Sequence, residues 1–147
     1  MRGDVFRRMV VGGRAEVTPQ GSPEALRQLR LRYGLMARTA DTYAAAGFTA
    51  VAQDVVLGDE LARTAALFRT DPLLVVVLAP RPAAVAAREA GRAKTAYGPA
   101  WGVRELDAVL RDGTPRLGLW LDTSGQTPAE TADEILARAW HEARVEH

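Results

Sequence analysis

The chain has 147 residues, of which 48% are hydrophobic, and this is enough apolar material for the core of one domain. Its formal net charge of +1 gives no sign of a surface built to bind nucleic acid, and the lack of cysteine excludes disulfides and thiolate sites. No segment approaches the roughly 20 apolar residues of a membrane span, so we expect a soluble cytoplasmic protein without nucleic-acid or membrane partners.

The first half of the chain predicts a long helix followed by a strand. Ser22, Pro23 and Glu24 are typical of an N-cap, a first helical position and an acidic first turn. Apolar residues then recur every three or four positions up to Gly47, which is the period of an amphipathic helix. The apolar, partly β-branched run over residues 48–54 predicts a buried strand. We expect the helix to expose Arg27, Arg30, Arg32 and Arg38 on a solvated face.

The second half continues the alternation of helix and strand. We expect strands over 73–79 and 116–122, and helices over 59–68, from Pro82 onward and over 103–112. The two strand segments are apolar without alternation, which indicates strands covered on both faces, as in parallel sheets. Helices that alternate with such strands imply right-handed crossovers. The sequence therefore predicts one α/β domain over residues 1–147, with three α/β/α layers and a mostly parallel sheet.

The last helix has the clearest start signal in the chain. Thr127, Pro128 and Glu130 have the spacing of an N-cap, an N1 proline and the glutamate of a capping box. We expect its apolar face to consist of Ile135, Leu136, Ala139 and Trp140.

Candidate site residues follow the predicted strands, because ligands of open parallel sheets bind beyond the carboxyl ends of the strands. Asp54 ends the first strand, where a carboxylate can orient a magnesium-bound water or accept a proton. It can equally cap a helix that begins near Gly58. Asp122, Thr123 and Ser124 follow the last strand, where they can line a base or ribose pocket or simply form a turn.

A further acidic candidate lies close to the start of the chain. Asp4 precedes a short apolar and basic segment, and it can act as a general base that accepts a hydroxyl proton from a bound substrate. An N-cap role for the following helix explains the same residue equally well.

Arg88 and Arg92 are spaced to lie on one face of the helix that Pro82 opens. Guanidinium groups at positions i and i+4 repel each other unless water or an anion intervenes. They are suited to bind a phosphoryl group, because each presents paired donors to phosphate oxygens. A solvated face with Glu89 as local partner is the alternative. Arg81 lies next to the same helix, at its cap.

Four stretches, taken in order, resemble the P-loop small-molecule kinases that include chloramphenicol phosphotransferase-like and zeta-toxin-like proteins. They are "RGDVFRRM", "AAGFTAVAQDVVL", "VVVLAPRPAAVAAREAGR" and "LWLDTSGQTPAETADEIL". The resemblance covers most of the chain. It implies an ATP-dependent phosphotransferase that uses ATP and Mg²⁺ and acts on a hydroxyl of a small metabolite or antibiotic.

The resemblance also implies roles for particular residues. Asp4 matches the acidic residue that approaches the acceptor hydroxyl, and Asp54 matches an acidic position near the substrate. Arg88 and Arg92 match lid arginines that cover the phosphates. The loop that contains Thr123 and Ser124 matches the segment beside the adenine.

One part of the family pattern does not occur in these residues. A P-loop kinase needs GxxxxGK[ST], whose amides, lysine and hydroxyl hold the phosphates and magnesium, and the sequence contains no such motif. The match begins just before Asp4, so it leaves out the family's first strand, phosphate loop and first helix. Three explanations stay open: further residues upstream, an oligomer or another chain that completes the sheet, or a descendant that acts without nucleotide. The alternative function is a non-catalytic binding module on a degenerate kinase scaffold.

Overall fold

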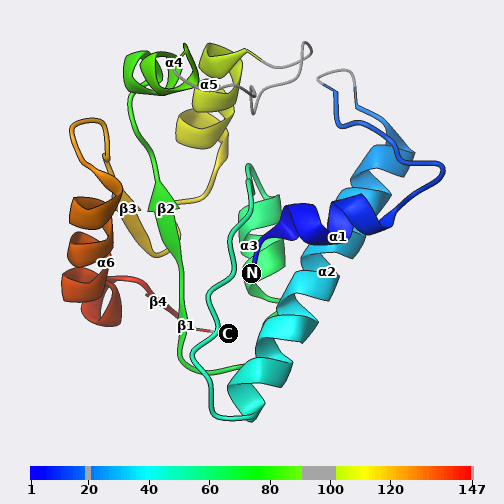
Figure 1. The fold of residues 1–147 in the computed structure, drawn as a ribbon, viewed down its shortest axis with the longest axis horizontal. Helices are drawn as coiled ribbons and strands as arrows, with labels where there is room; N and C mark the ends of the chain where they lie inside the picture. The colour runs from blue at the N-terminus through cyan, green and yellow to red at the C-terminus, as the bar shows by residue number, and fades with distance from the viewer. Residues whose placement is uncertain (19–20, 91–101, 147) are drawn as a thin grey trace. The chain divides into compact units, whose positions relative to one another are not determined.

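A computed structural model describes residues 1–18, 21–90 and 102–146, and these residues form two compact units (Figure 1). Unit 1 consists of Met1–Val56 and Ala62–Asp71, and unit 2 consists of Leu57–Leu61 and Pro72–His147. Each unit is described by itself. None of the helices in the described ranges is long and apolar enough to cross a membrane.

Unit 1 is built on α2 (Pro23–Ala45), which confirms the predicted long helix. Ser22 is its N-cap, and the hydroxyl accepts a hydrogen bond from the amide of Ala25 at 3.3 Å. Tyr33 is the largest fully buried side chain, and its hydroxyl donates to the carbonyl of Val55 at 2.8 Å. This bond ties the middle of α2 to the segment after residue 53. The short helix α1 (Gly3–Met9) packs against α2.

The strand predicted over residues 48–54 does not form. The segment makes one isolated parallel bridge, between Arg2 and Gln53, through bonds from the Gln53 amide to Met1 and from the Gly3 amide to Gln53. Phe48 is 64% exposed rather than buried. A strand requires a neighbour that pairs over several residues, and here α1 begins as soon as the first residues have made this bridge.

Unit 2 contains the four short strands of the described residues. β1 (Leu73–Leu74) pairs antiparallel with β4 (Arg144–Val145), and β2 (Val76–Leu78) pairs parallel with β3 (Leu119–Leu121). The predicted strand over 73–79 is therefore divided at Val75. The Val75 amide donates to Ala143 at 2.8 Å, and its carbonyl accepts from Leu119 at 2.9 Å, so the chain changes partner at this residue.

The predicted three-layer α/β/α fold with a mostly parallel sheet is wrong. Of the residues that the structure describes, 53% are helical, and these residues form two sheets of two strands each, one antiparallel and one parallel. Unbroken apolar runs indicate buried segments, but they do not show how many neighbours each segment has. In the described ranges the runs over 73–79 and 116–122 yield strands of two or three residues, each with one paired neighbour, and the run over 48–54 yields none.

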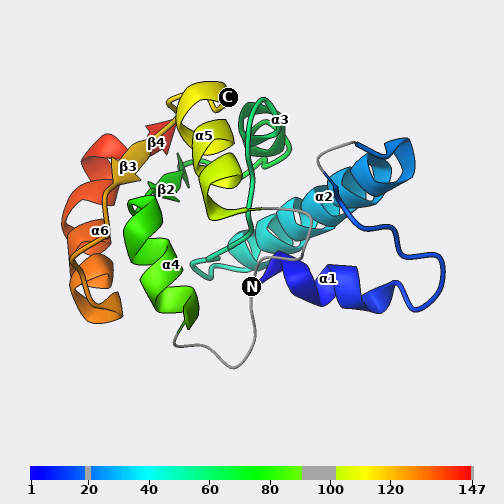
Figure 2. The same ribbon diagram turned by 90° about the horizontal axis from the view of Figure 1, so that it is seen from above.

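The helices of unit 2 begin where the sequence signals predicted. They are α4 (Pro82–Ala90), α5 (Val103–Gly113) and α6 (Pro128–Glu142), while α3 (Glu60–Ala65) spans the point where the two units meet in sequence. The capping box of α6 is present, since the Thr127 hydroxyl accepts from the Glu130 amide and the Glu130 carboxylate accepts from the Thr127 amide. Figures 1 and 2 show α4 and α5 side by side and α6 beside β3.

The core of unit 2 is small. It consists of Leu119, Leu121, Ala139 and Ala143, with Leu74, Val76 and Ile135 packed against it. Of the apolar face predicted for α6, Ala139 is buried, but Leu136 and Trp140 are 80% and 63% exposed. The helix therefore buries a narrower stripe than its composition indicates.

The parallel pairing of β2 with β3 requires Gly118 to lie very close to the backbone of Val75. Its φ is +69°, and a Cβ at this position would lie 2.1 Å from the Val75 carbonyl oxygen, the acceptor of the Leu119 amide. We expect Gly118→Ala to lower the free energy of unfolding by about 2 to 3 kcal/mol, through backbone strain and separation of β2 from β3. Urea denaturation measures it. Gly125→Ala is the matched control, because its Cβ would meet open space, and equal losses in both variants would contradict the argument.

Candidate functional site

The predicted site residues fall into two groups, one in each unit. Asp4 and Asp54 belong to unit 1, and Arg88, Thr123 and Ser124 belong to unit 2. Arg92 lies outside the described residues.

Asp54 is held by a buried ion pair with Arg32. The Arg32 Nη2 donates to Oδ1 at 2.9 Å, Nε lies 2.8 Å from Oδ2, and the two side chains are 13% and 6% exposed. The Val55 amide also donates to Oδ1, at 2.8 Å. The Nε–Oδ2 contact is an ion pair without hydrogen-bond geometry. Arg32 was expected on a solvated face, and that expectation is wrong. The buried carboxylate requires a cation, and Arg32 supplies it.

Asp4 lies in the first turn of α1, where a negative charge interacts favourably with the helix dipole. The N-cap of that helix is Arg2, so the alternative role of Asp4 as N-cap is not what the structure shows. Asp4 is an exposed residue. It lies close enough to Asp54 for the two charges to interact. The structure therefore brings these two predicted carboxylates together.

The pKa of Asp54 is raised above its ordinary value of 3.8, chiefly because burial penalises the charged form. The charge of Asp4 acts in the same direction, whereas Arg32 and the Val55 amide lower the pKa. The packing is close: a Cβ on Gly3 would lie 1.8 Å from Oδ2 of Asp54. Only glycine at position 3 leaves room for this carboxylate.

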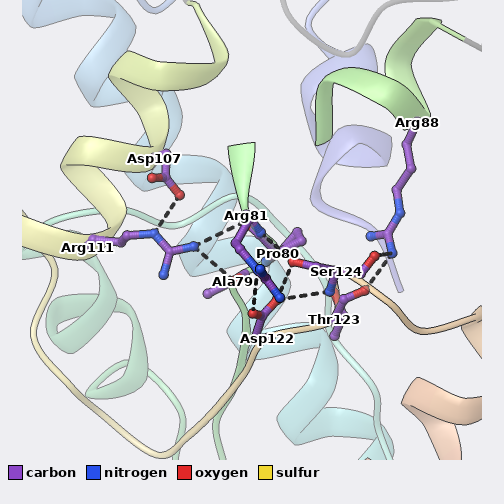
Figure 3. Close-up of polar contacts among 9 residues, drawn as sticks. All are labelled: Ala79, Pro80, Arg81, Arg88, Asp107, Arg111, Asp122, Thr123 and Ser124. Atoms are coloured by element: carbon purple, nitrogen blue, oxygen red, sulfur yellow. Dashed lines mark hydrogen bonds and ion pairs between the residues drawn. The ribbon is translucent and has the colours of Figure 1, made fainter. Parts of the chain in front are cut away.

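In unit 2 the parallel pairing places the ends of β2 and β3 side by side (Figure 3). Asp122 Oδ1 accepts hydrogen bonds from the Ser124 amide, at 2.9 Å, and from the Ser124 hydroxyl. The Arg81 amide donates to the Ser124 hydroxyl at 2.7 Å, and Arg81 Nε donates to Asp122 Oδ2 at 3.2 Å. Bonds from Ser124 hold the pKa of Asp122 below its ordinary value. Turn formation, one of the two predicted roles, is therefore present here.

Arg88 is bonded to the backbone of the loop that follows β3. Its Nη2 donates to the carbonyls of Thr123 at 2.5 Å and Ser124 at 3.4 Å (Figure 3). It also donates to the carbonyl of Gln126 at 3.2 Å. Carbonyl dipoles thus take the place of the anion that the arginine spacing suggested. Because hydrogen bonds to a charged donor are about twice as strong as neutral ones, Arg88 fastens this loop to α4.

A second arginine, which was not identified from the sequence, also donates hydrogen bonds to backbone carbonyls. Arg111 of α5 donates from Nη2 to the carbonyls of Ala79 at 3.1 Å and Pro80 at 3.2 Å, while its Nε donates to Asp107 at 2.8 Å. The i, i+4 spacing of Asp107 and Arg111 was the available signal, but nothing in the sequence indicated that the guanidinium reaches the end of β2.

The guanidinium of Arg81 is more exposed than that of Arg111. Its side chain is 74% exposed, compared with 34% for Arg111. Within the described ranges no group of three or more His, Cys, Asp and Glu side chains can hold a metal ion. Asp54, the carboxylate expected to orient a magnesium-bound water, is paired with Arg32. The edge thus offers the exposed guanidinium of Arg81 beside a hydrogen-bonded turn that carries a hydroxyl.

No protein-family model matches this chain, and no curated protein is significantly similar to it.

The burial of Asp54 gives a pH dependence with a definite sign. A carboxyl whose pKa is raised on folding stabilises the fold below its unfolded pKa and loses that contribution as pH rises through the folded value. We therefore expect the unfolding free energy of the wild type, relative to Asp54→Asn, to fall as pH rises from about 3.8, by at most about 1.4 kcal/mol per pH unit. Urea titrations across this range measure it. A relative stability that rises with pH would mean that Arg32 outweighs burial.

The bonds of Arg88 predict the rigidity of the loop after β3. We expect Arg88→Met to speed amide exchange of Ser124 and Gln126 by about 10- to 100-fold, because charged hydrogen bonds worth about 1.5 to 3 kcal/mol are lost. Hydrogen exchange read by mass spectrometry on peptides over 119–127 measures it. Arg104→Met, an exposed position on α5, is the control. Unchanged exchange in Arg88→Met would show that the loop is rigid without the arginine.

Proposed function

We propose that the chain acts in an ATP-dependent phosphotransferase that modifies a hydroxyl of a small metabolite or antibiotic. The phosphate-binding loop that such a reaction needs is not contained in residues 1–147 and would act together with them. The observation that supports the proposal most is the parallel pairing of β2 with β3. It puts Arg81, Asp122 and Ser124 beyond the carboxyl ends of adjacent strands, where open parallel sheets bind their ligands.

In this proposal Asp4 is the general base. It accepts the proton of the acceptor hydroxyl as the oxygen forms a bond to the γ-phosphorus and the bond between that phosphorus and the β,γ-bridging oxygen breaks, releasing ADP. The exposure of Asp4 supports this role, because an acceptor can reach its carboxylate. Asp54, buried and bonded to Arg32, would act on the substrate side through its charge on Asp4.

Within unit 2, taken by itself, the arginines are the candidates for contacts to the nucleotide. Arg81, with its exposed guanidinium, is suited to a phosphate oxygen. Arg88 would position the loop of Thr123 and Ser124 against the nucleotide, and its Nη1 and Nε stay candidates for a direct phosphate contact. Arg92 keeps its role as a predicted lid arginine. ATP as the donor is consistent with a cytoplasmic location, which is part of the same proposal.

One observation favours a second candidate, a non-catalytic binding module. Arg88 donates to three loop carbonyls, which is a structural role that requires no anion. In that case the edge of unit 2 would bind a ligand or partner without turnover.

Nucleotide binding separates the two candidates. The measurement compares the 147-residue chain with the same chain extended by the coding sequence that precedes Met1 in its gene, by titration calorimetry and by transfer of labelled γ-phosphate. The phosphotransferase proposal predicts turnover in the extended protein. It also predicts that Asp4→Asn lowers kcat by about 10²- to 10⁴-fold with little change in KM for ATP.

Asp133→Asn, an exposed carboxylate on α6, is the control and should leave kcat unchanged. If neither protein binds or hydrolyses nucleotide, the phosphotransferase proposal is wrong and the binding module stands.

A further inference from the structure

One edge of β2 is unpaired in unit 2. The Val75 carbonyl and the Ala79 amide bond to β3, and the Val75 amide bonds to Ala143, so odd-numbered residues face the paired edge. Backbone groups of alternate residues in a strand point to opposite edges. The amides and carbonyls of Leu74, Val76 and Leu78 therefore face the other edge, and both sheets of the described residues contain only two strands.

Between its bounding prolines, this edge carries no residue that would oppose pairing with another strand. Residues 73–79 carry no charge, proline or glycine, and Leu78 is 47% exposed. Natural edge strands are commonly protected by lysine, proline or bulges, and an apolar edge without them is a template for strand addition. Pro72 and Pro80 bound the segment and, without an N–H, limit pairing to the residues between them.

We propose that the free edge of β2 pairs antiparallel with the same edge of a second copy of this chain. The sequence from residue 71 to 81, DPLLVVVLAPR, reads almost the same from either end around Val76. An antiparallel register centred on Val76 places Val76 opposite Val76 of the second copy and Leu74 opposite Leu78. Each of these residue pairs exchanges two backbone hydrogen bonds, and all the groups involved lie on the unpaired edge.

Charge selects the antiparallel orientation. The segment has Asp71 at one end and Arg81 at the other. Antiparallel pairing brings the acidic end of one copy to the basic end of the other, whereas parallel pairing brings like charges together. The Arg81 side chain is 74% exposed and bonds to Asp122 through Nε. The two-fold arrangement closes on itself and yields a dimer.

The expected dimer is weak, because a pair of short strands buries less than the roughly 1,200 Å² typical of stable interfaces. Sedimentation velocity of the 147-residue chain over a concentration series measures the equilibrium. We expect a reversible monomer–dimer transition with micromolar dissociation. This inference does not depend on the phosphotransferase proposal.

Two edge variants test the register. Val76→Pro removes an N–H from the unpaired edge and leaves the bonds of Val75 and Ala79 to β3 in place, and Leu78→Lys adds a charge at an exposed side chain. Both should raise the dissociation constant at least tenfold with an unchanged circular dichroism spectrum. If Val76→Pro fails to fold, Leu78→Lys decides.

A charge exchange tests the orientation. Arg81→Asp or Asp71→Arg alone should weaken the dimer, and the double variant should restore it. A chain that stays monomeric up to its solubility limit overturns the proposal. So does a dimer that Val76→Pro and Leu78→Lys leave intact, since it would form through another surface, such as the exposed Leu136 and Trp140 of α6. Failure of the double variant to restore the dimer overturns the antiparallel register.

Discussion

The parallel pairing of β2 with β3 is the constraint on which the candidate site of unit 2 depends. It places the segments after both strands at one edge, where Arg81, Asp122 and Ser124 bond to one another. Arg88 from α4 and Arg111 from α5 then fasten the two loops through their carbonyls. The helices around the strands thus contribute cations that hold backbone in place, while the side chain of Arg81 is 74% exposed.

In unit 1 the constraint is a buried charge. Burial raises the pKa of Asp54, and Arg32 and the Val55 amide compensate part of that cost. Gly3 makes the close approach of α1 possible, and that approach sets the interaction between Asp4 and Asp54.

Helices were predictable from the sequence because their signals are local. The cap at Ser22 and the capping box at Thr127 mark the starts of α2 and α6 correctly. The architecture of the sheets could not be predicted from the sequence. An apolar run such as residues 48–54 forms a strand only if another segment pairs with it. The polar turn after β3 was predictable as one of two alternatives. The hydrogen-bond partners of Arg32 and the carbonyl partners of Arg111 could not be predicted, because they lie far away in sequence.

The register of the two central strands is the feature to measure first. Backbone NMR of the labelled chain should give interstrand contacts between residues that the parallel pairing places opposite each other, Val76 with Leu119 and Leu78 with Leu121. It should also show slow exchange for the amides of Leu119 and Ala79. Antiparallel contacts between these segments, or rapid exchange at both amides, would contradict the account of the unit 2 site.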